Sequence, residues 1–90
     1  GICAFNDEVA LAVLLGLRSL GLRAPHDLAV IGVDDIPGAA LAQPPLTTIV
    51  RDTDAVARSL VRRIVDALDR KQVPADPIQD PLRVQVRVSA

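Results

Sequence analysis

Residues 28–35 read Leu-Ala-Val-Ile-Gly-Val-Asp-Asp, an apolar run that stops abruptly at two carboxylates, Asp34 and Asp35. A short continuous apolar run is typical of a strand that is buried on both faces, as in a parallel sheet. Open α/β sheets bind their ligands in the crevice outside the carboxyl ends of their strands. We therefore predict that the two carboxylates lie at such an edge of a sheet, and that the function is to be sought there.

A second strand and a helix are predicted upstream of this run. Residues 2–5 read as a short buried strand, and Asn6 or Asp7 can cap a helix over about residues 7–20, which Gly21 terminates. Apolar side chains surround this helix almost completely, whereas a surface helix keeps a polar face. The helix therefore needs two partners. The short spacing to the next apolar run favours a right-handed strand–helix–strand unit with parallel strands.

Three further elements are predicted downstream. Two prolines, Pro44 and Pro45, force an extended segment that leads into a strand over residues 46–50. An amphipathic helix follows, capped near residues 52–54 and ending at about Lys71. Residues 73–81 contain three prolines and read as a loop, and residues 82–89 alternate apolar and polar side chains as in a half-buried strand.

The composition limits the class of function. Half of the 90 residues are hydrophobic but only one is aromatic, and the net charge is −1, so the chain has neither the positive charge nor the stacking platforms that nucleic-acid binding uses. The single Cys3 cannot form an intrachain disulfide and is predicted to be a small buried hydrophobe of the first strand. Because a lone cysteine gives no disulfide framework, a reducing compartment is the simpler assumption. The longest apolar run is too short to cross a membrane.

Catalytic motifs are not recognised in the sequence. It shows no glycine-rich phosphate loop, no metal-ligand spacing and no Ser-His-Asp order. We expect no enzyme activity, no catalytic residue, no metal and no cofactor.

Three residues are candidates for binding a small ligand. An ionised Asp34 at a strand end can accept hydrogen bonds from two neighbouring hydroxyls, although it could instead cap a turn, and we take Asp35 as structural. Asn6 can donate to and accept from a ligand at the end of the neighbouring strand, and helix capping is equally consistent with its position. Phe5 can stack on the apolar face of a sugar ring, and the alternative is that it belongs to the core.

The order of these motifs resembles the effector-binding region of lactose-repressor-type (LacI/GalR family) transcriptional regulators. The resemblance rests on Phe5-Asn6-Asp7, the Gly32-x-Asp34-Asp35 strand end, Pro45-Leu46-Thr47-Thr48 and Arg87-x-Ser89, and it spans nearly the whole chain. One departure is Val56-Ala57, where the family usually has a glycine near the start of the second helix.

The resemblance implies an α/β chain with part of a type I periplasmic-binding-protein-like fold: a mostly parallel sheet flanked by helices, truncated at the N-terminus. It implies that residues 1–46 belong to the C-terminal lobe of an effector-binding domain. Residues 47–80 would be the crossover and a helix that packs on the N-terminal lobe, and residues 81–90 a terminal strand that returns to the C-terminal lobe. Thr47 and Thr48 would then act as hinge residues where the chain passes between the lobes.

The resemblance also implies partners. The first helix and the loop after the two aspartates would form a homodimer interface, to which we assign Val9, Val13, Leu17 and Leu41, and the second helix could exchange between subunits. The function implied is effector sensing and dimerisation in a cytoplasmic regulator that responds to a sugar or similar metabolite and contacts DNA only through a module outside these residues. A fragment of a periplasmic sugar-binding transport protein is the alternative.

Overall fold

The computed structural model describes residues 1–72 and 82–90, so the loop predicted for residues 73–81 lies outside the described residues. The chain divides into two compact units, one of Gly1–Val50 with Arg83–Ala90 and one of Arg51–Leu82. The first unit extends to Val50 and so includes Thr47 and Thr48, both of which are buried within it.

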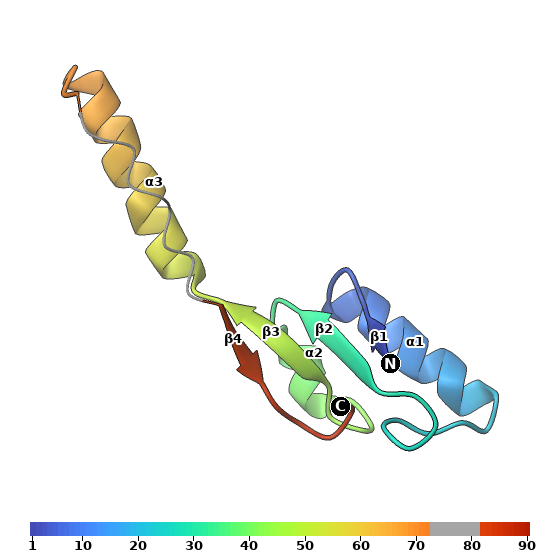
Figure 1. Ribbon diagram of the computed structural model, residues 1–90. Coiled ribbons are helices and arrows are strands. Elements are labelled where there is room, and N and C mark those ends of the chain that lie inside the picture. Colours follow the sequence, from blue (N-terminus) through green and yellow to red (C-terminus); the bar gives the residue numbers. More distant parts are fainter. Residues whose placement is uncertain (73–81) are drawn as a thin grey trace. The chain divides into compact units, whose positions relative to one another are not determined.

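A four-stranded sheet organises the fold, with the strands in the order β1 (Ile2–Cys3), β2 (Val30–Val33), β3 (Thr47–Arg51) and β4 (Leu82–Gln85) (Figure 1). The first three strands are parallel: Ile2 lies opposite Val30, and Ile31 lies opposite Thr47. The predicted α/β class and its parallel strands are thus confirmed. Because parallel strands end at one edge, the segments that follow β1 and β2 lie at the same edge of the sheet.

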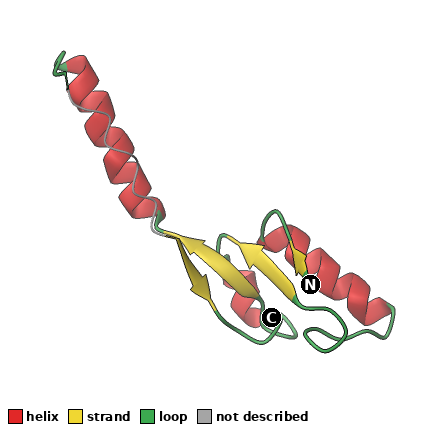
Figure 2. Cartoon of the chain, in the orientation of Figure 1, coloured by secondary structure: helices red, strands yellow, loops and turns green. Residues whose placement is uncertain are grey.

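Helix α1 (Asp7–Ser19) connects β1 to β2 and packs against β2 (Figure 2). Its inward face buries Ala10, Leu14 and Leu17. Asn6 is its N-cap, and Gly21, at φ +73°, adopts the left-handed conformation beyond its end, as predicted.

The short helix α2 (Pro37–Leu41) lies beside α1. A Cβ atom added to Gly38 would lie 3.6 Å from the Cδ1 atom of Leu11. Ala39 of α2, Val30 of β2 and Leu46 before β3 are fully buried and form the centre of the aliphatic core.

Two predictions of burial are wrong. Cys3 is exposed, because β1 is an edge strand of the described sheet. The apolar side chains of the last segment are also exposed, and its buried side chains are polar, since Ser89 is fully buried and Arg87 is largely covered. The exposed fractions of these apolar residues are between 54% and 69%, for Leu82, Val84, Val86 and Val88.

The second unit consists of α3 (Thr53–Leu68) and its flanking residues. The Asp52 carboxylate accepts a hydrogen bond of 2.9 Å from the amide of Ala55 and so caps the helix, one of the caps that the sequence predicts. No residue of α3 is buried, and its apolar stripe includes Leu60, Ile64 and Leu68 with exposed fractions of 45%, 59% and 78%.

Candidate functional site

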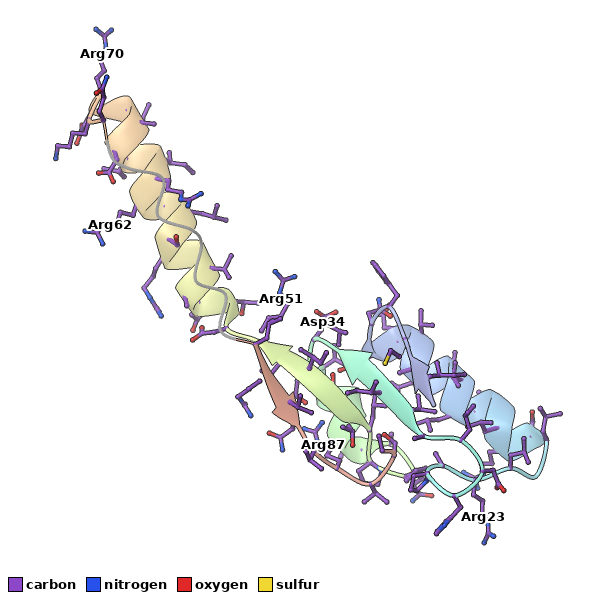
Figure 3. The ribbon with its side chains drawn as sticks, viewed as in Figure 1. Arg23, Asp34, Arg51, Arg62, Arg70 and Arg87 are labelled. Atoms are coloured by element: carbon purple, nitrogen blue, oxygen red, sulfur yellow. The ribbon has the colours of Figure 1, made fainter. Side chains whose placement is uncertain are left out.

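Asp34 immediately follows β2 at the carboxyl edge of the sheet (Figure 3). Its amide donates a 2.8 Å hydrogen bond to the carbonyl oxygen of Ile49 on β3, so the backbone continues the parallel ladder. The side chain is exposed, and its carboxylate has no hydrogen bond or ion pair with the described residues. An ionised carboxylate placed in this way can accept hydrogen bonds from a ligand.

The backbone of Asp34 and Asp35 is strained. Their φ angles are 104° and 53°, in the region that non-glycine residues rarely occupy. Such a conformation costs about 1–3 kcal/mol per residue and persists only where the surroundings impose it. Residues held in this way cluster at ligand sites, which is consistent with the role predicted for Asp34.

Asp35 forms an ion pair with Arg87. The Oδ1 atom of Asp35 lies 2.7 Å from Nη2 of Arg87, and the two side chains are only 22% and 17% exposed. Arg87 also donates from Nη1 to the carbonyl oxygen of Leu46, at 2.9 Å. Asp35 is thus held by a partner inside the first unit, in line with its predicted structural role.

Asn6 and Phe5 follow β1 at the same edge. Oδ1 of Asn6 accepts a 2.9 Å hydrogen bond from the amide of Val9, which establishes the capping role, while its side-chain nitrogen donates to no described residue. The ring of Phe5 is 88% exposed and is therefore not part of the core. Both residues keep a group that a ligand can contact.

Asp7 connects the two strand ends, and sequence reasoning missed this role. Its carboxylate is fully buried and does not cap α1. Oδ1 accepts a hydrogen bond of 2.5 Å from the hydroxyl of Thr48, and Oδ2 accepts one of 2.9 Å from the amide of Ile36. The segment that carries Asn6 is thereby tied to the turn that follows Asp34.

Gly32 supplies the signal that could have revealed this contact. A Cβ atom at residue 32 would lie 2.1 Å from Oδ1 of Asp7 and 3.2 Å from its Cα atom. A glycine inside an apolar strand often marks the close approach of another group. The glycine in the run of residues 28–35 therefore makes room for the buried carboxylate.

Thr47 and Thr48, the predicted hinge residues, are buried at the start of β3 with exposed fractions of 3% and 0%. The hydroxyl of Ser89 accepts from the amide of Thr47 and donates to the carbonyl oxygen of Val30, at 2.8 Å and 2.7 Å. Oγ1 of Thr47 accepts from the amide of Arg87 at 2.9 Å. Both threonines are anchored inside the first unit.

The residues predicted for a dimer interface differ widely in burial. Leu17 is 8% exposed and belongs to the core, so its assignment to an interface is corrected. Val13 is partly buried against that core, whereas Val9 and Leu41 are 46% and 82% exposed. Sequence reasoning could not separate these positions, because apolar residues surround almost the whole helix.

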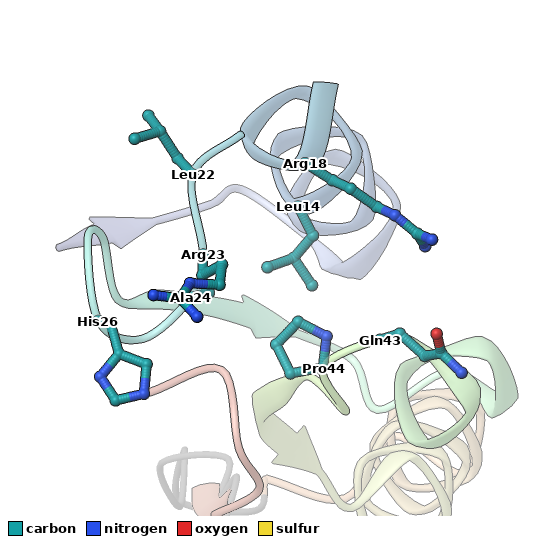
Figure 4. Close-up of a pocket in the computed structure, with 8 residues that line it drawn as sticks. All are labelled: Leu14, Arg18, Leu22, Arg23, Ala24, His26, Gln43 and Pro44. Atoms are coloured by element: carbon teal, nitrogen blue, oxygen red, sulfur yellow. The ribbon is translucent and has the colours of Figure 1, made fainter. Parts of the chain in front are cut away.

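A cavity of about 430 Å³ lies at the opposite edge of the sheet, where β2 and β3 begin (Figure 4). Leu14, Ala24 and Pro44 provide apolar walls, and Arg18 and His26 are among the polar residues that line it. No residue predicted to bind a ligand contributes to this cavity.

In the residues that the structure describes, no group of three or more His, Cys, Asp and Glu side chains could hold a metal ion. No described helix is long and apolar enough to span a membrane.

Comparison with known proteins gives one family over the whole chain. Residues 1–90 match the family described as periplasmic binding protein-like domain. The HTH-type transcriptional regulator CelR of Thermobifida fusca is 39% identical over 67 residues, which are 74% of this chain and 20% of CelR. The chain spans about a fifth of the length of the curated relatives that it matches first.

Two solved structures show the same arrangement of elements. A transcriptional regulator CelR–cellobiose complex has a TM-score of 0.88 at 33% identity and covers 98% of this chain, which corresponds to 27% of that one. The lac repressor dimer bound to operator and the anti-inducer ONPF has a TM-score of 0.86 at 28% identity, over 97% of this chain and 30% of that one. The resemblance to lactose-repressor-type regulators is thereby confirmed.

Proposed function

This chain belongs to the family of periplasmic binding protein-like domains, and from that premise we propose that it forms part of the sugar-sensing domain of a LacI-type transcriptional regulator. The observation that carries the proposal is the exposed carboxylate of Asp34, held in a strained backbone conformation at the carboxyl edge of the sheet. Curated relatives that are named as transcriptional regulators favour this function over that of a transport protein. A regulator of this kind is not an enzyme and acts in the cytoplasm.

The proposed ligand contacts come from the ends of two adjacent strands. The Asp34 carboxylate accepts hydrogen bonds from vicinal hydroxyls, and the Asn6 amide nitrogen donates to a ring or hydroxyl oxygen. Phe5 offers its exposed ring to the apolar face of the sugar. Polar groups of this kind fix the orientation of a sugar in its site, and the DNA contacts belong to residues outside this chain, whose net charge is −1.

In the proposal, the signal of effector binding passes through β3, the strand by which the chain leaves the first unit. Thr47 and Thr48 anchor β3 in the first unit, and the change in backbone angles on effector binding takes place after Val50, where the two units meet in sequence. A ligand that favours one arrangement of the units over the other shifts the population of that arrangement. In this proposal the backbone change therefore lies just beyond the predicted hinge residues, because Thr47 and Thr48 themselves are anchored in the first unit.

A homodimer is part of the same proposal. The surface we assign to it joins α1 to α2 and contains Leu15 and Leu41, which are 70% and 82% exposed. Leu11 and Ala42 line a groove of about 300 Å³ next to it. Burying a leucine side chain contributes about 1.5–3 kcal/mol, so Leu15 and Leu41 provide a substantial part of such an interface.

The proposal is tested on the full-length gene product with a panel of sugars that starts with cellobiose. Binding to the native state raises the melting temperature, and calorimetry then gives the affinity. Asp34→Asn keeps the size of the side chain and tolerates the positive φ, and it should weaken sugar binding about 10-fold to 100-fold. Asp27→Asn, which replaces an exposed carboxylate outside the proposed site, is the matched control and should bind as the unmodified protein does. Equal affinities for all three proteins would contradict the proposal.

A further inference from the structure

The turn after β2 is held by three bonds that come from three other segments. Asp34 donates its amide to Ile49 on β3, the amide of Ile36 donates to Asp7 on α1, and Asp35 accepts from Arg87 after β4. Asp34 and Asp35 have positive φ angles, a conformation that is unfavourable for residues other than glycine. These three bonds therefore maintain it. The direction of the Asp34 side chain therefore depends on residues that are distant in sequence.

Two hydrogen-bond relays lead from the start of β3 to this turn. In the first, Thr47 accepts from the amide of Arg87 at 2.9 Å, and the guanidinium of Arg87 reaches Asp35 at 2.7 Å. In the second, Thr48 donates to Asp7, which accepts from Ile36. Consecutive side chains of a strand point to opposite faces, so the relays run on opposite sides of β3 and hold adjacent residues of the turn.

Arg87 is suited to its relay because its donors have a fixed geometry. Nη1 donates to the carbonyl oxygen of Leu46 at 2.9 Å, while Nη2 donates to Asp35. The planar guanidinium makes both bonds at once, whereas a lysine ammonium on a flexible stem does not reproduce this fork. The chain around Leu46 and the turn at Asp35 are thus held at a set separation by one side chain.

We propose that Arg87 is a positioning residue for the effector site: it holds Asp35 against the start of β3 and so directs the neighbouring Asp34 carboxylate toward the sugar. This inference rests on the proposed function. Arg87 itself contacts no sugar. Its bonds to residues at the start of β3 make the placement of Asp34 depend on the strand by which the chain leaves the first unit.

The variants that test the proposal are Arg87→Gln and Arg87→Lys in the full-length gene product. Arg83→Gln is the matched control, because Arg83 is exposed and, among the described residues, its side chain bonds only to the nearby Gln85. Arg87→Gln should weaken cellobiose binding about tenfold. Arg87→Lys should bind cellobiose nearly as weakly as Arg87→Gln, because lysine does not reproduce the two bonds of the guanidinium. Arg83→Gln should bind cellobiose as the unmodified protein does. If Arg87→Gln does not fold, Arg87→Lys, which keeps the positive charge, carries the same comparison.

A double-mutant cycle separates positioning from a general loss of stability. Once Asp34→Asn has removed the carboxylate, adding Arg87→Gln should weaken cellobiose binding by less than about twofold more, since there is no longer a carboxylate to direct. A full tenfold further loss would overturn the proposal, because it would show that Arg87 acts independently of Asp34. Unchanged binding in both Arg87 variants would overturn it as well.

Hydrogen exchange without sugar distinguishes a failure of this inference from a failure of the proposed function. Arg87→Gln should accelerate exchange of the Ile36 amide about tenfold or more, while the Ala10 amide inside α1 exchanges as before. If the unmodified protein binds no sugar, the proposed function fails and the exchange rates still report on the turn. An unchanged rate at Ile36 in Arg87→Gln would overturn the positioning role whether or not sugar binds.

Discussion

The first unit and α3 use similar aliphatic residues with opposite results. In the first unit, Val30, Ala39 and Leu46 are fully buried, together with the polar side chains of Asp7, Thr48 and Ser89. In α3, by contrast, no residue of the apolar stripe is fully buried. Hydrophobic periodicity therefore determines the secondary structure of a segment, while burial depends in addition on a surface that covers the apolar stripe.

The buried polar groups of the first unit fix the register in which its helix and strands pack together. Apolar side chains of similar size can exchange places in a core at small cost, but an unpaired buried carboxylate or hydroxyl destabilises the fold. The hydrogen bonds of Asp7 and Ser89 fix how α1, β2 and β3 meet, because each bond is made only in one register. The same bonds place the proposed sugar contacts of Asn6 and Asp34 at one edge.

The largest effect on the free energy of unfolding is expected at Gly32, where the first unit has no room for a side chain. Gly32→Ala places a methyl group against the Asp7 carboxylate and backbone and should destabilise the unit by about 3 kcal/mol or more, because both the side chain and α1 must shift. Gly16→Ala is the control, since nothing lies within 4 Å of that position on α1. It should stabilise the protein by about 0.5–1 kcal/mol. Urea denaturation of both variants measures the difference, and equal stabilities would contradict the buried contact.

An intermediate effect is expected from one hydroxyl of the buried network. Thr48→Val keeps the shape of the side chain but removes the donor to Asp7, and it should lower the free energy of unfolding by about 1–3 kcal/mol. Thr53→Val changes an exposed threonine at the start of α3 and should alter that free energy by less than about 0.5 kcal/mol. If urea denaturation shows the two variants to be equally stable, the Asp7–Thr48 bond contributes nothing.

The smallest effect is expected in α3. Ile64→Ala in the 90-residue chain should change the free energy of unfolding by less than about 0.5 kcal/mol, since the side chain is 59% exposed and alanine favours a helix. Leu46→Ala, in the core of the first unit, should cost about 2–5 kcal/mol. A loss above about 2 kcal/mol for Ile64→Ala would show that α3 is covered and would remove the contrast between the two regions.

Much of the fold follows from local signals in the sequence. The cap at Asn6, the terminator at Gly21 and the apolar run of residues 28–35 suffice to predict α1, β2 and the parallel arrangement. The position of Asp34 follows from the same signals, because a carboxylate that ends a buried strand has a predictable place at the sheet edge.

The remaining features depend on contacts between distant residues. Alternation over residues 82–89 predicts one strand with two faces but does not show which face is covered. In the structure β4 ends at Gln85, and the polar side chain that is fully buried, Ser89, lies beyond it and is bonded to Thr47 and Val30. The sequence predicts Asp7 as a possible helix cap and gives no sign of its partners, Thr48 and Ile36, which are 41 and 29 residues away. Periodicity does not distinguish a core position from a partner surface, and for that reason the sequence does not show that Leu17 belongs to the core.

A crystal structure of the full-length gene product with cellobiose tests the central claim most directly. We predict sugar hydroxyls within hydrogen-bonding distance of the Asp34 carboxylate, at the carboxyl ends of β1 and β2, with Arg87 bonded to Asp35 and not to the sugar. Cellobiose bound in the cavity lined by Leu14, Arg18 and Pro44, with Asp34 facing solvent, would contradict the account.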